Sequence, residues 1–138
     1  MKIICVIDGQ GGGIGSTIIK KIKELYGETL EVIALGTNAI ATAQMLKAGA
    51  NRGASGDNAI IQTTKNVDVI LGPIGIIFAH AMMGEVTPAI AEAVAVSPAA
   101  KFLLPLTQEN VTVVGVARLP LPHLIEELID MYLHDFIA

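Results

Sequence analysis

The chain has 138 residues, of which 52 % are hydrophobic and 16 % charged, and its formal net charge is −4. This length fits one domain spanning residues 1–138 and leaves little room for a second. The sequence has no basic stripe and only two Tyr, three Phe and no Trp to stack on bases, which argues against nucleic acid as a partner.

The N-terminal residues 3–7 are apolar and mostly β-branched, and Asp8 and Gly9 close the run. This pattern predicts a buried strand. Cys5 is the single cysteine, so it forms no internal disulfide, and we expect it to be a small buried thiol. Because the run is too short for a signal peptide or a membrane span, we expect a cytoplasmic protein with no membrane partner.

Four segments carry apolar side chains at helical spacing, and they end near residues 26, 48, 66 and 96. These segments are predicted helices, and residues that commonly begin or end helices stand at their boundaries. Gly27 ends the first, Thr37 or Asn38 caps the second and Gly49 ends it, Asp57 caps the third, and Thr87 with Pro88 begins the fourth.

The apolar runs between these helices predict strands, since they are short and rich in β-branched residues. Residues 51–56 form a polar connection with room for a short edge strand, and residues 74–83 fit an extended run and a buried helix equally well. The predicted strands after the first cover residues 30–35, 67–71, 102–104 and 111–116.

A final helix follows Pro120 and Pro122. Residues 119–138 contain four acidic side chains and no Lys or Arg, so they account for the whole net charge, and His123 and His134 are expected on the solvated side. The predicted apolar face consists of Leu121, Leu124, Ile125, Leu128, Ile129, Tyr132 and Phe136.

Strands and helices therefore alternate along most of the chain, and right-handed crossovers turn this order into a parallel sheet. The predicted fold is a Rossmann-like, doubly wound α/β domain, with a mainly parallel sheet of about five strands and helices on both faces. The hydrophobic share exceeds what a small monomer needs, so we also expect a homo-oligomer.

The strongest functional signal is the glycine-rich turn at residues 8–17, between the first strand and the first helix. Free amides and the positive end of the helix dipole meet at such a turn and favour a phosphate group. The alternative is an empty, tight turn that only brings helix and strand together. The predicted binding residues here are Gly9, Gly11, Gly12, Gly13, Gly15, Ser16 and Thr17.

Three known signatures lie near this turn, and the sequence departs from each. The spacing of Gly9, Gly13 and Gly15 resembles that of short-chain dehydrogenases, but no Tyr-x-x-x-Lys pair occurs. The run is similar to the nucleotide-binding P-loop with Ser16 in place of the lysine, and it also looks like the glycine loop of tubulin. The acidic residue that holds a ribose in NAD sites is missing, since Gly36-Thr37-Asn38 follows the second strand.

Over nearly its whole length the chain resembles an uncharacterised family of short bacterial proteins, known only as a domain of unknown function. The resemblance implies a Rossmann-like fold and no particular activity. It is carried by Asp8-Gly9-Gln10-Gly11-Gly12-Gly13-Ile14-Gly15, by Gly53-Ala54-Ser55-Gly56-Asp57-Asn58-Ala59-Ile60, and by Gly72-Pro73-Ile74-Gly75-Ile76-Ile77 continuing to Gly84-Glu85-Val86-Thr87-Pro88.

Ligands of doubly wound sheets lie outside the carboxyl ends of the strands. Further predicted binding residues at that edge are Gly36, Thr37, Asn38, Gly72 and Pro73, and residues 105–107 reach the same edge. Helix capping is the alternative explanation for Thr37 and Asn38.

Asp8, His80 and Glu85 are the candidate catalytic residues, and Asp8 and His80 also have a structural explanation. Asp8 can orient the turn by accepting amide hydrogen bonds, and an isolated His in an apolar stretch is commonly a hydrogen-bonded residue. Lys101 could neutralise a phosphate or simply lie on the surface. No zinc-type spacing and no nucleophile elbow occurs, so no metal is expected.

The predicted function is therefore binding of a phosphate-bearing small molecule, with a nucleotide or dinucleotide as the possible cofactor. A small enzyme whose site is completed at an oligomer interface is one alternative. A structural or interaction module without a ligand is another.

Overall fold

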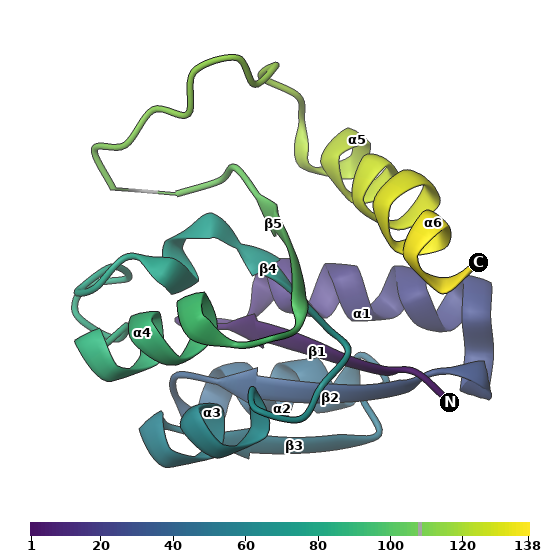
Figure 1. Ribbon diagram of the computed structural model, residues 1–138, viewed down its shortest axis with the longest axis horizontal. Coiled ribbons are helices and arrows are strands. Elements are labelled where there is room, and N and C mark those ends of the chain that lie inside the picture. Colours follow the sequence, from purple (N-terminus) through teal and green to yellow (C-terminus); the bar gives the residue numbers. More distant parts are fainter. Residues whose placement is uncertain (108) are drawn as a thin grey trace.

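The computed structural model describes residues 1–107 and 109–138 and contains one parallel sheet of five strands in the order β3-β2-β1-β4-β5. This is the strand order of a Rossmann-like sheet, in which the order reverses between β1 and β4. The predicted fold class is confirmed (Figure 1). The strands are β1 (Ile3–Asp8), β2 (Glu31–Gly36), β3 (Arg52–Ser55), β4 (Val69–Pro73) and β5 (Ala100–Leu104).

Helices cover both faces of this sheet. One face carries α1, α2 and the C-terminal helix, and the other carries α3, η2 and α4. The helical segments are α1 (Gly13–Tyr26), η1 (Gly27–Thr29), α2 (Ala39–Lys47), α3 (Asp57–Thr63), η2 (Ile74–Ile77), α4 (Pro88–Val96), α5 (Leu121–Glu126), η3 (Glu127–Leu133) and α6 (His134–Ile137).

The central strand β1 divides its side chains between two apolar cores. Ile4 and Val6 point into the core beneath α1, whereas Cys5 and Ile7 point into the core beneath α3 and α4. All four side chains are fully buried, as the alternation of side chains along a strand between two covered faces requires. The expected burial of the Cys5 thiol is confirmed.

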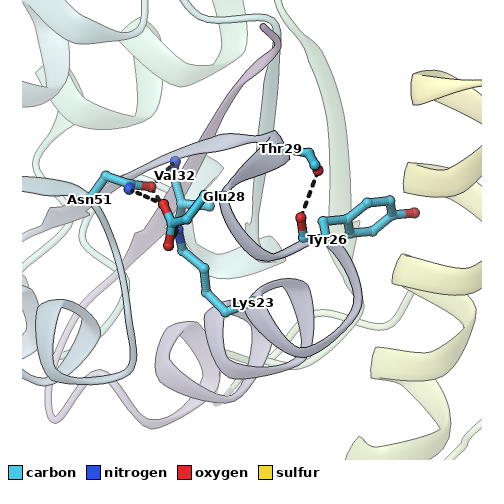
Figure 2. A network of polar contacts seen from close by, with 6 residues as sticks. All are labelled: Lys23, Tyr26, Glu28, Thr29, Val32 and Asn51. Carbon is cyan, nitrogen blue, oxygen red and sulfur yellow. Dashed lines mark hydrogen bonds and ion pairs between the residues drawn. The ribbon is translucent and has the colours of Figure 1, made fainter.

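A polar network connects the elements at the amino-terminal edge of the sheet, the edge at which the strands begin (Figure 2). The side-chain amide of Asn51 accepts the backbone N–H of Val32 and donates to Glu28, and the Lys23 ammonium reaches both Glu28 and Asn51. The end of α1 is thereby tied to β2 and to the start of β3. Because the Glu28 side chain is exposed to water, the Lys23–Glu28 ion pair adds little energy by itself, and its role is to set the connection.

Most predicted helix boundaries are confirmed. Asn38 caps α2 by accepting the N–H of Ala41, and Thr87 caps α4 by accepting the N–H of Ile90. The prediction for Asp57 was wrong, because Gly56 is the N-cap of α3 and Asp57 is its first residue. The Asp57 carboxylate instead accepts the hydroxyl of Thr87 and so links the starts of α3 and α4.

Residues 51–56 contain the short edge strand for which the sequence left room, and residues 74–83 are neither a strand nor a long helix. The latter begin with the short 3₁₀ helix η2 and continue as tight turns through residue 84.

The strand predicted at residues 111–116 was wrong. The segment is irregular, and its β-branched residues pair with no strand among the described residues of this chain. Strand propensity describes how a residue fits a pleated surface, so it produces a strand only where a neighbouring edge is available. Figure 1 shows this part of the chain arching away from β5 before it returns to α5.

Most of the predicted apolar face of the final helix is confirmed, since Leu124, Ile125, Leu128 and Ile129 are buried. The middle of this helix is the π segment η3. The exception is Tyr132, which is about half exposed with its ring 5.8 Å from that of Phe102, while Leu133 is buried. His123 and His134 are exposed, as predicted.

No helix among the described residues is both long and apolar enough to cross a membrane.

Two glycines at the start of α1 give a matched test of helix packing. A Cβ on Gly15 would lie 3.0 Å from the Cβ of Asp8 and 2.5 Å from the sulfur of Met45, whereas a Cβ on Gly13 would meet no atom. We expect Gly15→Ala to lower the free energy of unfolding by about 1–3 kcal/mol through overpacking. Gly13→Ala should be neutral or stabilising by up to about 1 kcal/mol.

Urea unfolding of both variants measures this difference. Equal stabilities would contradict the close approach of α1 to β1.

Candidate functional site

The candidate site lies at the carboxyl edge of the sheet, where the strand order reverses between β1 and β4. A cavity of about 240 Å³ opens there. It is bounded by the end of β1, the start of α1, the end of β4 and the two segments that follow β4 and β5. Its lining residues are Asp8, Gln10, Ile14, Pro73, Gly75, Met82, Leu106, Thr107 and Glu109.

Asp8 ends β1 beneath the first turn of α1 and is only 4 % exposed. Its carboxylate accepts the N–H groups of Gly9 and Gly15, both at 2.8 Å. Burial raises the pKa of this carboxyl above its usual value, and the hydrogen bonds from Gly15, Gly9 and Ile14 oppose that rise. The nearby Glu85 carboxylate adds a smaller increase in the pKa. Asp8 therefore orients the turn, as one of its two interpretations predicts, and it also faces the cavity.

Glu85 is held over the turn by three donors that converge on a single carboxylate oxygen. The backbone N–H of Gln10, the hydroxyl of Thr37 and the side-chain amide of Asn38 all donate to Oε1, at 2.7–2.8 Å. Partial burial opposes the charged form, but these hydrogen bonds outweigh it, so the pKa of Glu85 lies below its usual value. A carboxylate of the protein itself thus occupies a ready-made anion position.

The segment that carries Glu85 has an unusual backbone. His80, Met82 and Met83 have φ values of 71°, 58° and 57°, which side chains other than glycine rarely adopt. Such conformations persist only where surrounding contacts enforce them. Here the Glu85 carboxylate fixes one end, and the Glu109 carboxylate accepts the N–H of Met82 at 3.1 Å.

Most glycines of the predicted site are explained by close packing. Added Cβ atoms at Gly9, Gly36 and Gly72 would collide with Thr37, Thr42 and the carbonyl of Ile7, respectively. Gly12 has a φ of 72° and faces the backbone of Ala41. Close packing therefore accounts for glycine at these positions and at Gly15.

Gly11 and Gly13 are different. Both are exposed, and a Cβ at either would meet open space. No hydrogen bond formed by the described residues engages their N–H groups, although Gly9, Gln10 and Gly15 all donate to carboxylates. These two amides are what remains available to an outside anion at the head of α1.

The two hydroxyls predicted beside the turn contribute little to the cavity. Thr17 donates to the carbonyl of Gly13, and neither Thr17 nor Ser16 belongs to the cavity lining. The buried Ser16 hydroxyl has no hydrogen-bond partner among the described residues. Pro73 does line the cavity, while Thr37 and Asn38 are engaged by Glu85.

His80 is exposed and lies outside the cavity lining, and Lys101 lies at the start of β5, away from the turn. The Lys101 ammonium donates to the carbonyls of Ser97 and Ala99.

The predicted site residues did not include Gln10, Ile14, Gly75, Met82 and Glu109, which line the cavity. The signal for Gln10 was its place inside the glycine run. Met82 follows β4 and Glu109 follows β5. Both are distant from the glycine turn in sequence, and only folding brings them to the cavity.

The charge of the cavity is negative. Asp8 and Glu109 are its ionisable lining residues, and no Lys, Arg or His joins them. Within residues 1–107 and 109–138, no three His, Cys, Asp or Glu side chains gather closely enough to hold a metal ion.

A parallel sheet in this order, with a glycine-rich turn between its first strand and first helix, defines a Rossmann-like α/β protein. The chain belongs to the family described as "Domain of unknown function (DUF3842)", whose family model matches residues 3–136. This confirms the resemblance seen in the sequence. The family's description assigns no activity.

None of the curated proteins matches the sequence. Among solved structures, the chain is similar to a dodecameric FMN-dependent UbiX-like decarboxylase from Escherichia coli O157:H7, with 13 % identity and a TM-score of 0.48. The similarity covers 100 % of this chain and 95 % of that one.

Glu85 should give the stability a characteristic pH dependence. Because its pKa is lower in the folded than in the unfolded chain, the unfolded state binds more protons in that window. The contribution of Glu85 is therefore present above its usual pKa of 4.5 and is lost as the pH falls through the lowered folded value.

Glu85→Gln keeps the accepting oxygen but removes the charge. Subtracting its unfolding free energy from that of the parent between pH 3 and 6, as titration windows of carboxyls suggest, should leave a difference that grows with pH. Glu24→Gln, which alters an exposed carboxylate on α1, is the matched control and should leave no such difference. A flat difference for Glu85→Gln would contradict the assignment.

Proposed function

We propose that this protein binds a small phosphate-bearing molecule at the carboxyl edge of its sheet. The observation that carries the proposal is the pair of unengaged amides at Gly11 and Gly13, which lie in open space at the head of the 14-residue helix α1. Backbone amides and the helix dipole can hold a phosphate without basic side chains. The rest of the ligand would extend past Gln10 and Ile14 into the cavity.

The geometry favours a small ligand over a dinucleotide. A cavity of about 240 Å³ is below the range of roughly 300–1,000 Å³ that is usual for drug-sized ligands. Next to β2, the Glu85 carboxylate accepts hydrogen bonds from Thr37 and Asn38. These two residues were predicted from the sequence to bind the ligand. A dinucleotide could bind across the turn only if Glu85 moved.

The carboxylates beside the turn restrict where the phosphate can sit. Asp8 already receives the amides of Gly9 and Gly15, so a phosphate placed over them would meet a buried negative charge. Gly11 and Gly13 lie on the exposed side of the turn, where water screens that repulsion. The phosphate would therefore bind at the solvent side, with the uncharged part of the ligand inside.

Ligand binding is tested by thermal unfolding with inorganic phosphate, small sugar phosphates, mononucleotides and dinucleotides. A ligand at 100 times its Kd stabilises the native state by about 2.7 kcal/mol, which raises Tm by several degrees. We expect small phosphorylated compounds to produce this shift. Gly11→Val and Gly13→Val should abolish it, because each places a branched side chain beside the two amides.

Ala89→Val is the matched control, since it adds the same bulk in the first turn of α4, remote from the cavity. It should respond to ligand as the parent does. If no phosphate compound raises Tm, or if both glycine variants respond like the parent, the proposal is wrong. The remaining interpretation is then an interaction module without a ligand, in which the protein's own carboxylates accept the hydrogen bonds of the turn's amides.

A second candidate function, enzymatic turnover of the bound molecule, is favoured by one observation. Asp8 is buried, lines the cavity and has a raised pKa, which are properties that suit a proton-transfer group. His80 is exposed and lies outside the cavity lining.

If turnover occurs, phosphorus NMR of the protein with a bound phosphate compound should detect conversion, and Asp8→Asn should reduce its rate by at least about 100-fold, the usual contribution of acid–base catalysis. His80→Ala is the control and should retain the rate. Conversion that survives Asp8→Asn would exclude Asp8 as the proton-transfer group.

We further propose that the protein works in the cytoplasm as a homo-oligomer. Its single buried thiol suits a reducing compartment, and its apolar surplus suits a subunit interface.

A further inference from the structure

The segment between β5 and α5 contains a strand-forming sequence that has no strand to pair with. Residues 111–116 read Val-Thr-Val-Val-Gly-Val, yet their one described backbone hydrogen bond runs from Val111 to the nearby carbonyl of Glu109. All four valines are exposed, and Val114 is 92 % exposed. Single exposed apolar residues are ordinary, but four within six residues would give a strand an apolar pair on each face, and such a concentration of exposed apolar side chains is typical of an interface.

The edge strand β5 presents the complementary feature. It pairs with β4 on one side, and no described strand pairs with its other side. Lysines often protect such edges by projecting charge over them. Here the Lys101 ammonium is turned back onto the carbonyls of Ser97 and Ala99, so it does not serve in this way.

A groove of about 590 Å³ runs beside this edge. The groove is lined by Phe102 and Leu104 of β5 and by Leu124 and Leu128 of the C-terminal helix. Val113, Gly115, Val116 and Ala117 of the chain's own segment after β5 also line it. Glu127 also lines the groove. Arg118, which directly follows the valine run, is exposed, and neither residue takes part in an ion pair within the described part of the chain.

The chain cannot supply a parallel sixth strand to its own sheet. A parallel connection needs a crossover of about a dozen residues or more, and residues 105–110 are too few. An antiparallel return is within their reach, yet the chain arches away from β5 instead (Figure 1). A parallel partner for β5 must therefore come from another molecule.

We propose that two copies of this chain exchange residues 111–116, each copy adding this segment to the β5 edge of the other. In this arrangement Val114 and Val116 of one copy take the place beside β5 that the other copy's own segment lines when it is alone, while Val111 and Val113 lie on the opposite face of the sheet. Arg118 meets the partner's Glu127. Such an exchange is reciprocal, so it closes as a two-fold dimer and leaves no edge open at this end of either sheet. The inference is independent of the ligand proposed above.

Sedimentation velocity at 1–100 µM, the range in which weak protein dimers form, tests the proposal first. The parent should sediment with the mass of two chains. Val114→Asp should lower the dimer affinity by at least about 100-fold, because it places an unpaired charge in an apolar contact. Val96→Asp is the matched control, since Val96 is 72 % exposed on α4 and lies outside the groove.

A parent that sediments as one chain throughout would overturn the proposal. A dimer that survives Val114→Asp, or that is lost equally in Val96→Asp, would also overturn it. Circular dichroism should show that both variants fold, as expected for substitutions at exposed positions.

Cross-linking then tests the exchange itself. Protein carrying Lys101→Cys is mixed with protein carrying Val114→Cys, and a short bismaleimide is added. The native Cys5 is fully buried and should not react. A covalent product of two chains that requires both variants supports the exchange, and its absence from a mixture that sediments as a dimer contradicts it.

Discussion

The buried carboxylate of Asp8 is the contact on which the rest of the site depends. It joins the end of the central strand to the head of the first helix through the amides of Gly9 and Gly15. These two hydrogen bonds fix the path of the glycine turn. The turn then places the backbone N–H of Gln10 where it donates to the Glu85 carboxylate. The removal of Asp8 from water is costly, and the donated hydrogen bonds offset that cost.

The turn therefore divides its donors between internal and external acceptors. In the usual Rossmann arrangement these amides face a pyrophosphate. Here the protein's own carboxylates accept the amides of Gly9, Gln10 and Gly15, whereas the amides of Gly11 and Gly13 have no hydrogen-bond partner among the described residues. A glycine-rich sequence thus carries two kinds of glycine, those required by packing and those that leave room for a ligand, and the binding proposal depends on the second kind alone.

Local patterns predicted the fold well because each core strand and cap follows from neighbouring residues. The alternation of Ile4, Cys5, Val6 and Ile7, and the caps at Asn38 and Thr87, are examples. The site was predicted less well, because the contact between Glu85 and Gln10 joins residues 75 positions apart. Residues 111–116 show a third limit: their propensity was recognised correctly, but a strand also needs a neighbour. The burial of Leu133 instead of Tyr132 falls within the π segment η3, which the sequence pattern did not predict.

The position of Cys5 has a practical consequence. This sole thiol lies in the middle of the central strand, between two neighbouring strands and beneath helices, and burial raises its pKa well above the usual value. Alkylating reagents react with the thiolate form, which the buried thiol does not readily adopt. They can therefore react with Cys5 only after the sheet has separated and exposed it to water. The rate at which the native protein loses its free thiol is therefore a direct measure of how often the whole molecule opens.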